Sequence, residues 1–139
     1  MLTNTESRKR VNSQVIKALT TVGLKDGIAL TQEQLKNTKD ITFWHTGNMT
    51  ATNQATYVTY SIAGTRAAVR GDDKTLLRDN TLAIDVFSKV SFESRANVTL
   101  LANIEDALIN AGFEVQFEAE QYERDTALFH MPITAFKII

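Results

Sequence analysis

The sequence predicts an α+β fold in which two helices pack on one face of a mainly antiparallel sheet. Three observations predict it. Apolar and polar residues alternate over four segments, as they do in strands with one buried and one solvent-facing side. Two other segments repeat apolar residues at helical spacing. The resulting order α-β-β-α-β-β predicts a single antiparallel sheet with both helices on the same face.

Length and composition fit one globular domain over residues 1–139. Hydrophobic residues make up 43% of the chain and charged residues 22%, which argues against wholesale disorder. The absence of cysteine excludes disulfides, thiolate metal sites and thiol nucleophiles. No apolar run reaches the roughly 18 residues of a membrane-spanning helix, and residues 1–10 lack the apolar core of a signal peptide, so we expect a cytosolic protein without membrane contacts.

Two segments have the apolar spacing of amphipathic helices. The first is Thr5–Val22, with Thr5 as its cap and Gly23 as its end; its apolar residues are Val11, Val15, Ala18, Leu19 and Val22. The second is Ser94–Ala111, capped by Ser94 and ended by Gly112; its apolar stripe consists of Val98, Leu101, Ile104, Leu108 and Ala111.

The region after the first helix is less regular. A short helix is expected at Thr31–Asn37, where Thr31 and Gln34 have the spacing of a capping box. A strand is expected to start at Asp40–Phe43, followed by a small, polar loop that begins with Trp44. Trp44 is a candidate contact anchor if exposed. The alternative is that Phe43 and Trp44 pack into the core, which the usual burial of large aromatics favours.

Two strands are expected at Thr56–Ala63 and Asn80–Lys89, with a loop at Gly64–Asp79 between them. They predict a long hairpin whose tip is the Arg66–Arg78 region. The tip is a basic projection partly offset by acidic residues: it contains Arg66, Arg70, Lys74 and Arg78, with Asp72, Asp73 and Asp79.

A second hairpin is expected at the carboxyl end. Phe113–Glu120 and Phe129–Ala135 alternate strictly, and the polar break Gln121–Thr126 separates them. Pro132 lies inside the last strand and has no N–H for a sheet ladder, so we expect this strand at a sheet edge or bulged at Pro132. An edge strand is a place where another subunit can be added.

Charge is distributed unevenly along the chain. Residues 1–40 carry seven Lys and Arg against four Asp and Glu, and residues 101–139 carry two against seven. The opposite signs favour head-to-tail association of identical subunits. The alternative is an acidic sheet face that meets only solvent. The lack of a clustered basic face disfavours general nucleic-acid binding.

No pattern of residues indicates catalysis. His45 and His130 lie on separate predicted elements, with His130 on the solvent side of its strand, and no spacing predicts converging metal ligands. The sequence has no phosphate-binding glycine loop, nucleophile elbow or zinc-protease helix. We therefore expect no catalytic residue, no metal and no cofactor, and a protein that is not an enzyme.

Four stretches carry a resemblance to a known family: Tyr57-Val-Thr-Tyr60, Asp79-Asn-Thr-Leu-Ala-Ile-Asp-Val-Phe-Ser-Lys89, Glu105-Asp-Ala-Leu-Ile-Asn-Ala-Gly-Phe113 and Gln121-Tyr-Glu-Arg-Asp-Thr-Ala-Leu-Phe-His130. Over about Val11–Phe136 the chain resembles the small tail-completion, or tail-terminator, proteins of long-tailed phages with non-contractile tails. None of these stretches is a catalytic signature.

The resemblance implies a structural protein that forms a hexameric ring on the end of the tail tube, stops tube growth and offers a surface to the head connector. Its implied partners are copies of itself, the tail tube protein and the head-completion or connector protein, with DNA only as passing cargo. It implies a place in the virion, after assembly in the host cytoplasm. Assembly only on a tube, from a monomer in solution, is also compatible with it.

Loop position and residue type give Trp44, Arg66, Arg70, Arg78 and Pro132 as candidate interface residues. The acidic side of the last hairpin gives three candidate channel-lining residues, Glu114, Glu118 and Glu120. The alternatives are a head-completion adaptor of the neck, a binding module unrelated to phages, and a small hydrolase. The hydrolase would need a deep pocket that holds His45 or His130 with a carboxylate.

Overall fold

The computed structural model describes residues 3–20, 22, 25–26, 42–45, 56–71 and 74–139. The expected helix at Thr31–Asn37 lies outside the described residues. The described elements are α1 (Asn4–Thr20), β1 (Lys25–Asp26), β2 (Thr42–His45), β3 (Thr56–Gly71), β4 (Lys74–Ser88), α3 (Arg95–Asn110), β5 (Glu114–Phe117), β6 (Gln121–Glu123) and β7 (Leu128–Ile138).

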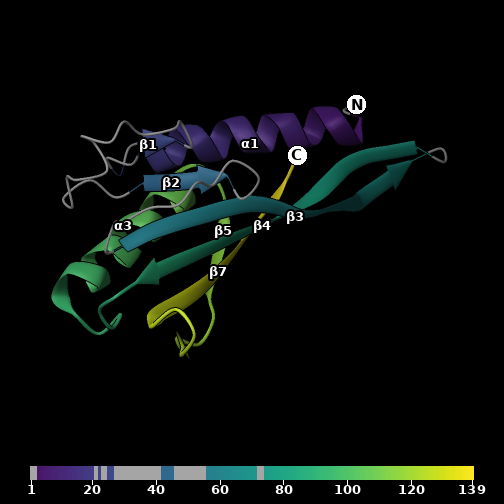
Figure 1. The fold of residues 1–139 in the computed structure, drawn as a ribbon. Helices are drawn as coiled ribbons and strands as arrows, with labels where there is room; N and C mark the ends of the chain where they lie inside the picture. The colour runs from purple at the N-terminus through teal and green to yellow at the C-terminus, as the bar shows by residue number, and fades with distance from the viewer. Residues whose placement is uncertain (1–2, 21, 23–24, 27–41, 46–55, 72–73) are drawn as a thin grey trace.

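The predicted α+β fold is confirmed (Figure 1). The strands form one sheet in the order β1-β2-β3-β4-β7-β5, and β6 also pairs with β7. Pairing is antiparallel from β3 through β4 and β7 to β5, as expected, and parallel where β1 meets β2 and β2 meets β3. The expected order α-β-β-α-β-β is also confirmed, in α1, β3, β4, α3, β5 and β7; β2 begins within the strand start expected at Asp40–Phe43, and β1 and β6 are additional.

Both helices pack on the same face of this sheet. Alternate strand residues on that face form one apolar core with the helices; its residues include Val11, Val15 and Leu19 of α1, Val58 and Tyr60 of β3, Leu82, Ile84 and Val86 of β4, Leu100, Leu101, Ile104 and Leu108 of α3, and Ile133 and Ala135 of β7. Burying these side chains is the main source of stability, at about 25 cal/mol for each Å² of apolar surface removed from water. The alternation expected along β3 and β4 is confirmed, since every second residue over Val58–Tyr60 and Leu82–Val86 belongs to this core.

The start of α1 differs from the prediction. The Thr3 N–H donates to Glu6 Oε2 at 2.8 Å, and the Glu6 N–H donates to Thr3 Oγ1 at 3.1 Å. This reciprocal pair is a capping box, which satisfies N–H groups that the first helical turn leaves without partners. The cap is therefore Thr3 and the prediction of Thr5 is wrong, because Thr3 has the required Glu three residues later.

The predicted ends of α3 are confirmed. The Ser94 Oγ accepts a hydrogen bond from the Asn97 N–H at 3.4 Å. At the other end Gly112 has a φ of +91°, the Phe113 N–H donates to the Leu108 carbonyl, and the Gly112 N–H donates to the Ile109 carbonyl. These paired bonds form a Schellman motif, in which glycine adopts the left-handed conformation at least cost.

One predicted core residue of α3 faces solvent instead. Val98 is 52% exposed, whereas Asn97 beside it is buried. The Asn97 amide donates to Ser88 Oγ and to the Val90 carbonyl, both at 3.0 Å, so its polar atoms have partners inside the protein. Asn97, whose amide is hydrogen-bonded inside the protein, therefore occupies a buried position of α3 where helical spacing predicts an apolar residue.

The predicted loop at Gly64–Asp79 is wrong, because β3 continues to Gly71 and β4 begins at Lys74. The two strands stay paired through register shifts at Ile62/Gly64, Ala67/Val69 and Val69/Arg70. Within the described residues, 67–71 and 74–77 pair only with each other. They form a two-stranded arm that projects beyond the rest of the sheet (Figure 1).

Pro132 does not lie on an edge strand, so the edge prediction is wrong. β7 lies inside the sheet, between β4 on one side and β5 and β6 on the other. Phe117 pairs with Ile133 and Gln121 pairs with His130, so residues 118–120 oppose only residues 131–132. This extra residue makes a bulge, and the Pro132 carbonyl accepts the Glu118 N–H there at 3.0 Å. The alternative, a bulge of the last strand itself, is not what the structure shows: β7 stays in register with β4 through the Asp85–Pro132 pair, and the bulge lies opposite Pro132 in residues 118–120. A bulge beside it accommodates a residue without an N–H.

Candidate assembly surfaces

The face of the sheet opposite the helices carries a row of rings. Because Val58, Val86 and their neighbours face the helices, the next residues along each strand face the other way. Tyr57, Phe87 and His130 are paired across β3, β4 and β7. The Tyr57 and Phe87 ring centroids lie 5.1 Å apart, and those of Phe87 and His130 lie 4.5 Å apart, in stacked pairs. We call this face the outer face.

His130 links the ring row to two carboxylates. Its Nε2 lies 2.6 Å from Asp85 Oδ1, and its Nδ1 lies 3.4 Å from Glu123 Oε1. The second contact lacks hydrogen-bond geometry, so Nδ1 is a buried atom without a hydrogen-bond partner. Burial, and secondarily the negative charge of Glu123, raise the pKa of Tyr57. The row therefore combines ring stacking with contacts between His130 and carboxylates of β4 and β6.

This arrangement gives little support to hydrolysis. Both imidazole nitrogens face carboxylates of the same chain, so neither is turned toward a space where a substrate would lie. His130 does not line any of three hollows formed by described residues, beside β5, between α1 and β3, and at the end of α3. Within the same residues, no group of three or more His, Cys, Asp or Glu side chains is arranged to hold a metal ion. His45 lies in β2, and its side chain is outside the described part of the structure.

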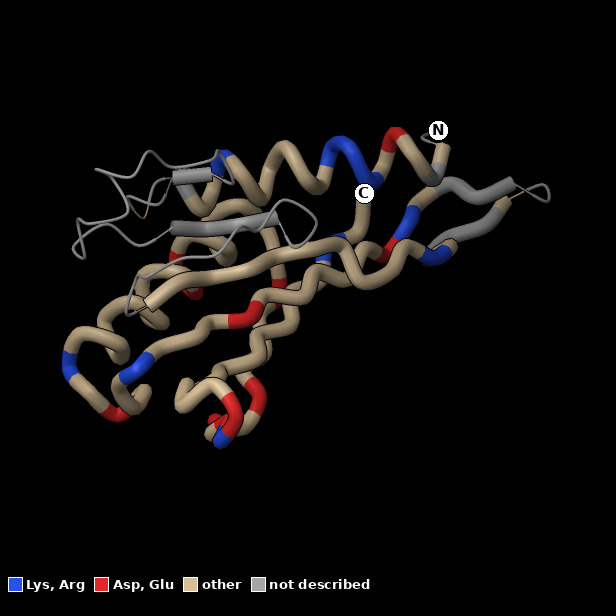
Figure 2. Tube along the Cα trace, viewed as in Figure 1, with Lys and Arg blue, Asp and Glu red and all other residues tan. Residues whose placement is uncertain are grey.

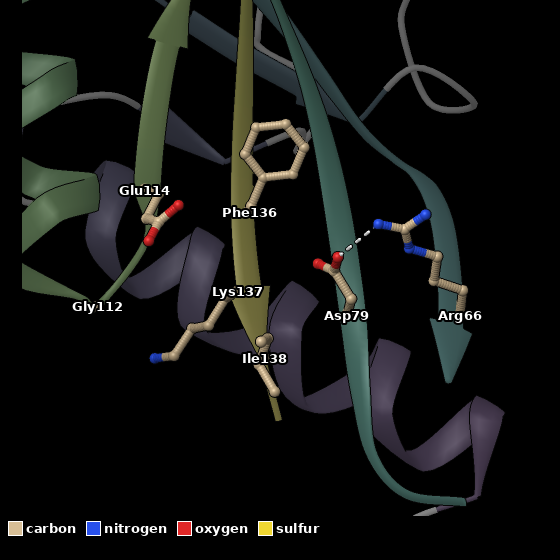
Figure 3. Close-up of a pocket in the computed structure, with 7 residues that line it drawn as sticks. All are labelled: Arg66, Asp79, Gly112, Glu114, Phe136, Lys137 and Ile138. Atoms are coloured by element: carbon tan, nitrogen blue, oxygen red, sulfur yellow. Dashed lines mark hydrogen bonds and ion pairs between the residues drawn. The ribbon is translucent and has the colours of Figure 1, made fainter. Parts of the chain in front are cut away.

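An open hollow of about 550 Å³ lies on the outer face beside β5. Arg66, Asp79, Glu114, Phe136 and Ile138 line it (Figure 3), together with Gly112 and Lys137. Arg66 Nη2 forms an ion pair with Asp79 Oδ2 at 3.3 Å, and the other oxygen of Asp79 is buried without a hydrogen-bond partner. Lys137 is held elsewhere, because its Nζ donates to Gln14 Oε1 and to the Ala111 carbonyl at the end of α3.

A second hollow, of about 400 Å³, lies between α1 and β3; it is lined by Thr5, Arg8, Lys9, Asn12, Ser61 and Ile62. Arg8 Nη2 donates to the Ile62 carbonyl at 3.4 Å. Arg8, Lys9 and Arg10 are all exposed. We call this hollow the α1–β3 groove, and its described lining carries positive charge without a carboxylate.

Two separate surfaces of the molecule thus carry opposite charges. Lys and Arg occur along α1 and at the base of the arm, and Asp and Glu gather around β5 and the turn between β6 and β7 (Figure 2). The chain matches no protein-family model and no curated protein. Among the described helices, none has the length and apolar character needed to cross a membrane.

The structure does not bring the five predicted interface residues together. Trp44 lies in β2 and not in a loop, with its backbone paired to Thr59; its side chain lies outside the described part. Pro132 belongs to the same row across the sheet, opposite Asp85. Arg66, Arg70 and Arg78 lie on the arm and at its base, far from that row. The Arg66 side chain is 83% exposed, Arg78 is half-buried, and the Arg70 side chain is outside the described part.

The three predicted channel-lining glutamates also separate. Glu114 lies on the outer face at the 550 Å³ hollow, and Glu118 accepts a hydrogen bond from Gln116 Nε2 at 3.1 Å. Glu120 instead accepts hydrogen bonds from the Phe92 N–H at 2.8 Å and from Ser91 Oγ at 3.2 Å. The carboxylate of Glu120 therefore fixes the turn that leads into α3.

Sequence reasoning missed the row of Tyr57, Phe87 and His130 with Asp85 and Glu123. One signal was present in the sequence. Each of the three rings occupies a polar-side position of an alternating strand, where an aromatic residue is unexpected. The stacking itself depends on which residues pair across β3, β4 and β7, and this register cannot be predicted from the sequence of one strand alone.

Proposed function

We propose that this protein is a structural component of a phage, which caps the tail tube as a ring, ends tube polymerisation and provides the head-to-tail joining surface. The observation that carries the proposal is the opposite charge of two separate surfaces, the basic α1–β3 groove and the acidic β5 end. Such a pair of surfaces suits repeated head-to-tail contacts between identical subunits, which close into rings when the rotation allows.

Other features support the same proposal. The four stretches that resemble tail-terminator proteins lie in β3, in β4, at the end of α3 and in β6 and β7, and so belong to the helices and strands of one fold. The β3–β4 arm extends beyond the sheet and gives a long, two-sided contact surface for a neighbouring subunit or for the tube. We expect the protein to recognise its partners through the shape and charge of these surfaces, and to do so in the virion.

The test is a measurement of mass and shape in solution and on tail tubes. We expect the purified protein to bind the end of cognate tail tubes and to form rings there, seen by electron microscopy, and to stop tube extension when free tube protein is added. Binding to tail-less heads but not to free tails would overturn the proposal in favour of a head-completion adaptor. A monomer or dimer that binds neither would favour a binding module unrelated to phages.

A further inference from the structure

Two of the sheet edges that lack a neighbouring strand among the described residues lie beside opposite charges. On one side β5 and β6 pair only with β7. On the other side β3 pairs with β2 over Tyr57–Tyr60 and beyond that point pairs only with β4. An unpaired edge presents main-chain N–H and C=O groups to whatever lies beside it, so each edge is able to accept a further strand.

The β3 edge opens into the basic α1–β3 groove. The Ile62 carbonyl points toward α1, since Arg8 Nη2 reaches it at 3.4 Å. At this distance the hydrogen bond is long and weak, and the side-chain donor occupies the place that a strand N–H would take. Lys9 and Asn12 line the same groove and supply further donors to an incoming acidic segment.

The β5–β6 edge has the complementary character. Glu114 and Glu118 are exposed there, and neither takes part in an ion pair among the described residues. Two large apolar side chains are exposed on the same edge, Phe117 at 38% and Tyr122 at 54%. Exposed aromatics among like charges are typical of a surface that is covered by a partner, since rings supply most of the binding energy and charges select the partner.

We propose that the β5–β6 edge of one copy docks in the α1–β3 groove of a second copy, and that this contact joins neighbouring subunits. The carboxylates of Glu114 and Glu118 meet Arg8 and Lys9, and the main chain of β5 pairs with β3 beyond Tyr60. Arg8 then moves from the Ile62 carbonyl to a carboxylate and leaves that carbonyl to accept a strand N–H. This interface deepens the proposed ring, and it rests on that proposal only for closure of the contacts into a ring.

Charge excludes the symmetric alternatives. Pairing of two β5 edges would set Glu114 and Glu118 of both copies against one another, and pairing of two β3 edges would bring two sets of Arg8 and Lys9 together. Like charges in direct contact disfavour both arrangements, whereas the mixed contact places opposite charges together. The interface is therefore head-to-tail, and each copy uses both edges at once.

Cross-linking tests the contact directly, because the chain has no cysteine of its own. We would combine a Gln116→Cys variant with an Ala63→Cys variant, since both residues are exposed and lie on the two edges. A short bis-maleimide should join the two variants when they are mixed, at high concentration or on tail tubes, and should give no dimer with either variant alone. Asn103→Cys on the exposed surface of α3, mixed with Ala63→Cys, is the control that should not cross-link.

Charge exchange gives an independent readout. The double variant R8E/K9E makes the groove acidic, and E114K/E118K makes the edge basic. Each double variant alone should self-associate about tenfold or more weakly than the original chain, and an equal mixture should recover association because each edge then meets an opposite groove. Far-UV circular dichroism of each variant checks that the helices remain folded.

The possible outcomes test the proposed interface and the proposed tail function separately. Absence of the mixed cross-link both in solution and on tubes, dimers of a single cysteine variant, or failure of the mixture to recover association would each overturn the interface. Head-to-tail cross-linking in a protein that does not bind tubes would support the interface and overturn the proposed function. Rings on tubes without the cross-link would support the function and overturn the interface.

Discussion

Asn80 of β4 donates a hydrogen bond to the hydroxyl of Ser7 in α1 at 3.1 Å, and both side chains are fully buried. Thr65 Oγ1 donates to Asn80 Oδ1 at 3.0 Å, and the Asn80 amide also reaches the Lys137 carbonyl at 3.4 Å. One amide therefore connects a helix with three strands at the base of the arm. Such a network fixes the relative position of its elements because each buried polar group depends on the others.

Substitution of Asn80 by alanine should lower the free energy of unfolding by about 1–3 kcal/mol, because it leaves the buried Ser7 hydroxyl and the half-buried Thr65 hydroxyl without this partner. Urea denaturation followed by circular dichroism measures the change. The matched control is Asn103→Ala on the exposed surface of α3, which should change stability by no more than about 0.5 kcal/mol. Equal effects of the two substitutions would contradict the role of the network.

Substitution of Gly112 by alanine should cost about 1–2 kcal/mol, because the φ of +91° at this position brings a Cβ close to the following carbonyl. A Cβ would also meet Lys137 Nζ at 3.1 Å and disturb its hydrogen bonds to Gln14 Oε1 and the Ala111 carbonyl, which adds to the cost of the backbone conformation. Gly64→Ala is the matched control, since a Cβ there meets no atom within 4 Å. Thermal or urea unfolding should show that Gly112→Ala is less stable than Gly64→Ala. A destabilised Gly64→Ala with an unchanged Gly112→Ala would disprove this account.

Acid should loosen the first turn of α1. Hydrogen bonds from the Thr3 main chain and side chain lower the pKa of Glu6. A lowered pKa in the folded state means that the contribution to stability is present above the unfolded pKa and is lost as pH falls through the folded value. Amide exchange of residues 4–7 should therefore accelerate as pH falls below the ordinary pKa of a glutamate and through the lowered pKa of Glu6, beyond the intrinsic pH dependence of exchange. Glu6→Gln should remove this pH dependence, and a titration of Glu6 at its ordinary pKa would contradict it.

Tyr57 should ionise later than an exposed tyrosine. Burial raises the pKa of its phenol, and the charge of Glu123 adds to the effect. Because the folded pKa is raised, the stability that Tyr57 contributes is fully present below the unfolded pKa and is lost as pH rises through the folded value. Ultraviolet absorbance titration, with Tyr57→Phe subtracted, isolates this phenol. Glu123→Gln should bring its pKa part of the way down, and an unchanged titration in that variant would leave burial as the sole cause.

Local sequence signals predicted the ends of α3 and the inward faces of the strands. Ser94 and Gly112 act through hydrogen bonds and backbone conformation within their own few residues, so their roles are visible in sequence. The alternation around Val58 and Ile84 is equally local, because one buried face imposes a period of two. These signals were sufficient for the fold class and for the order of its long elements.

The features that were predicted wrongly depend on contacts between residues that are far apart in the sequence. Gly64–Asp79 has the composition of a loop, yet β3 and β4 continue through it because each strand supplies the partner of the other. Pro132 suggested an edge, but the bulge at residues 118–120 on the neighbouring strands accommodates its missing N–H. The buried Asn97 could not be inferred from helical spacing, since its partners Ser88 and Val90 lie outside α3.

The candidate surfaces show the same division. The opposite charges of the first and last parts of the chain were visible in the sequence. The α1–β3 groove, however, requires α1 to lie against β3, and the ring row requires the register of three strands. The separation of Glu120 from Glu114 and Glu118 follows from the bulge, which turns the chain toward the entrance of α3.

The central position of β7 bears on how the chain folds during synthesis. Residues 128–138 fill the space between β4 and β5, so a nascent chain on the ribosome cannot close its sheet until this segment has emerged from the exit tunnel. Until then, among the described elements, the apolar side of the β3–β4 ribbon is covered by α1 and α3 but not completed by β7, and pairing over such sequence distances is slow. We therefore expect a chain that stops before residue 128 to expose part of this apolar side and to be prone to aggregation.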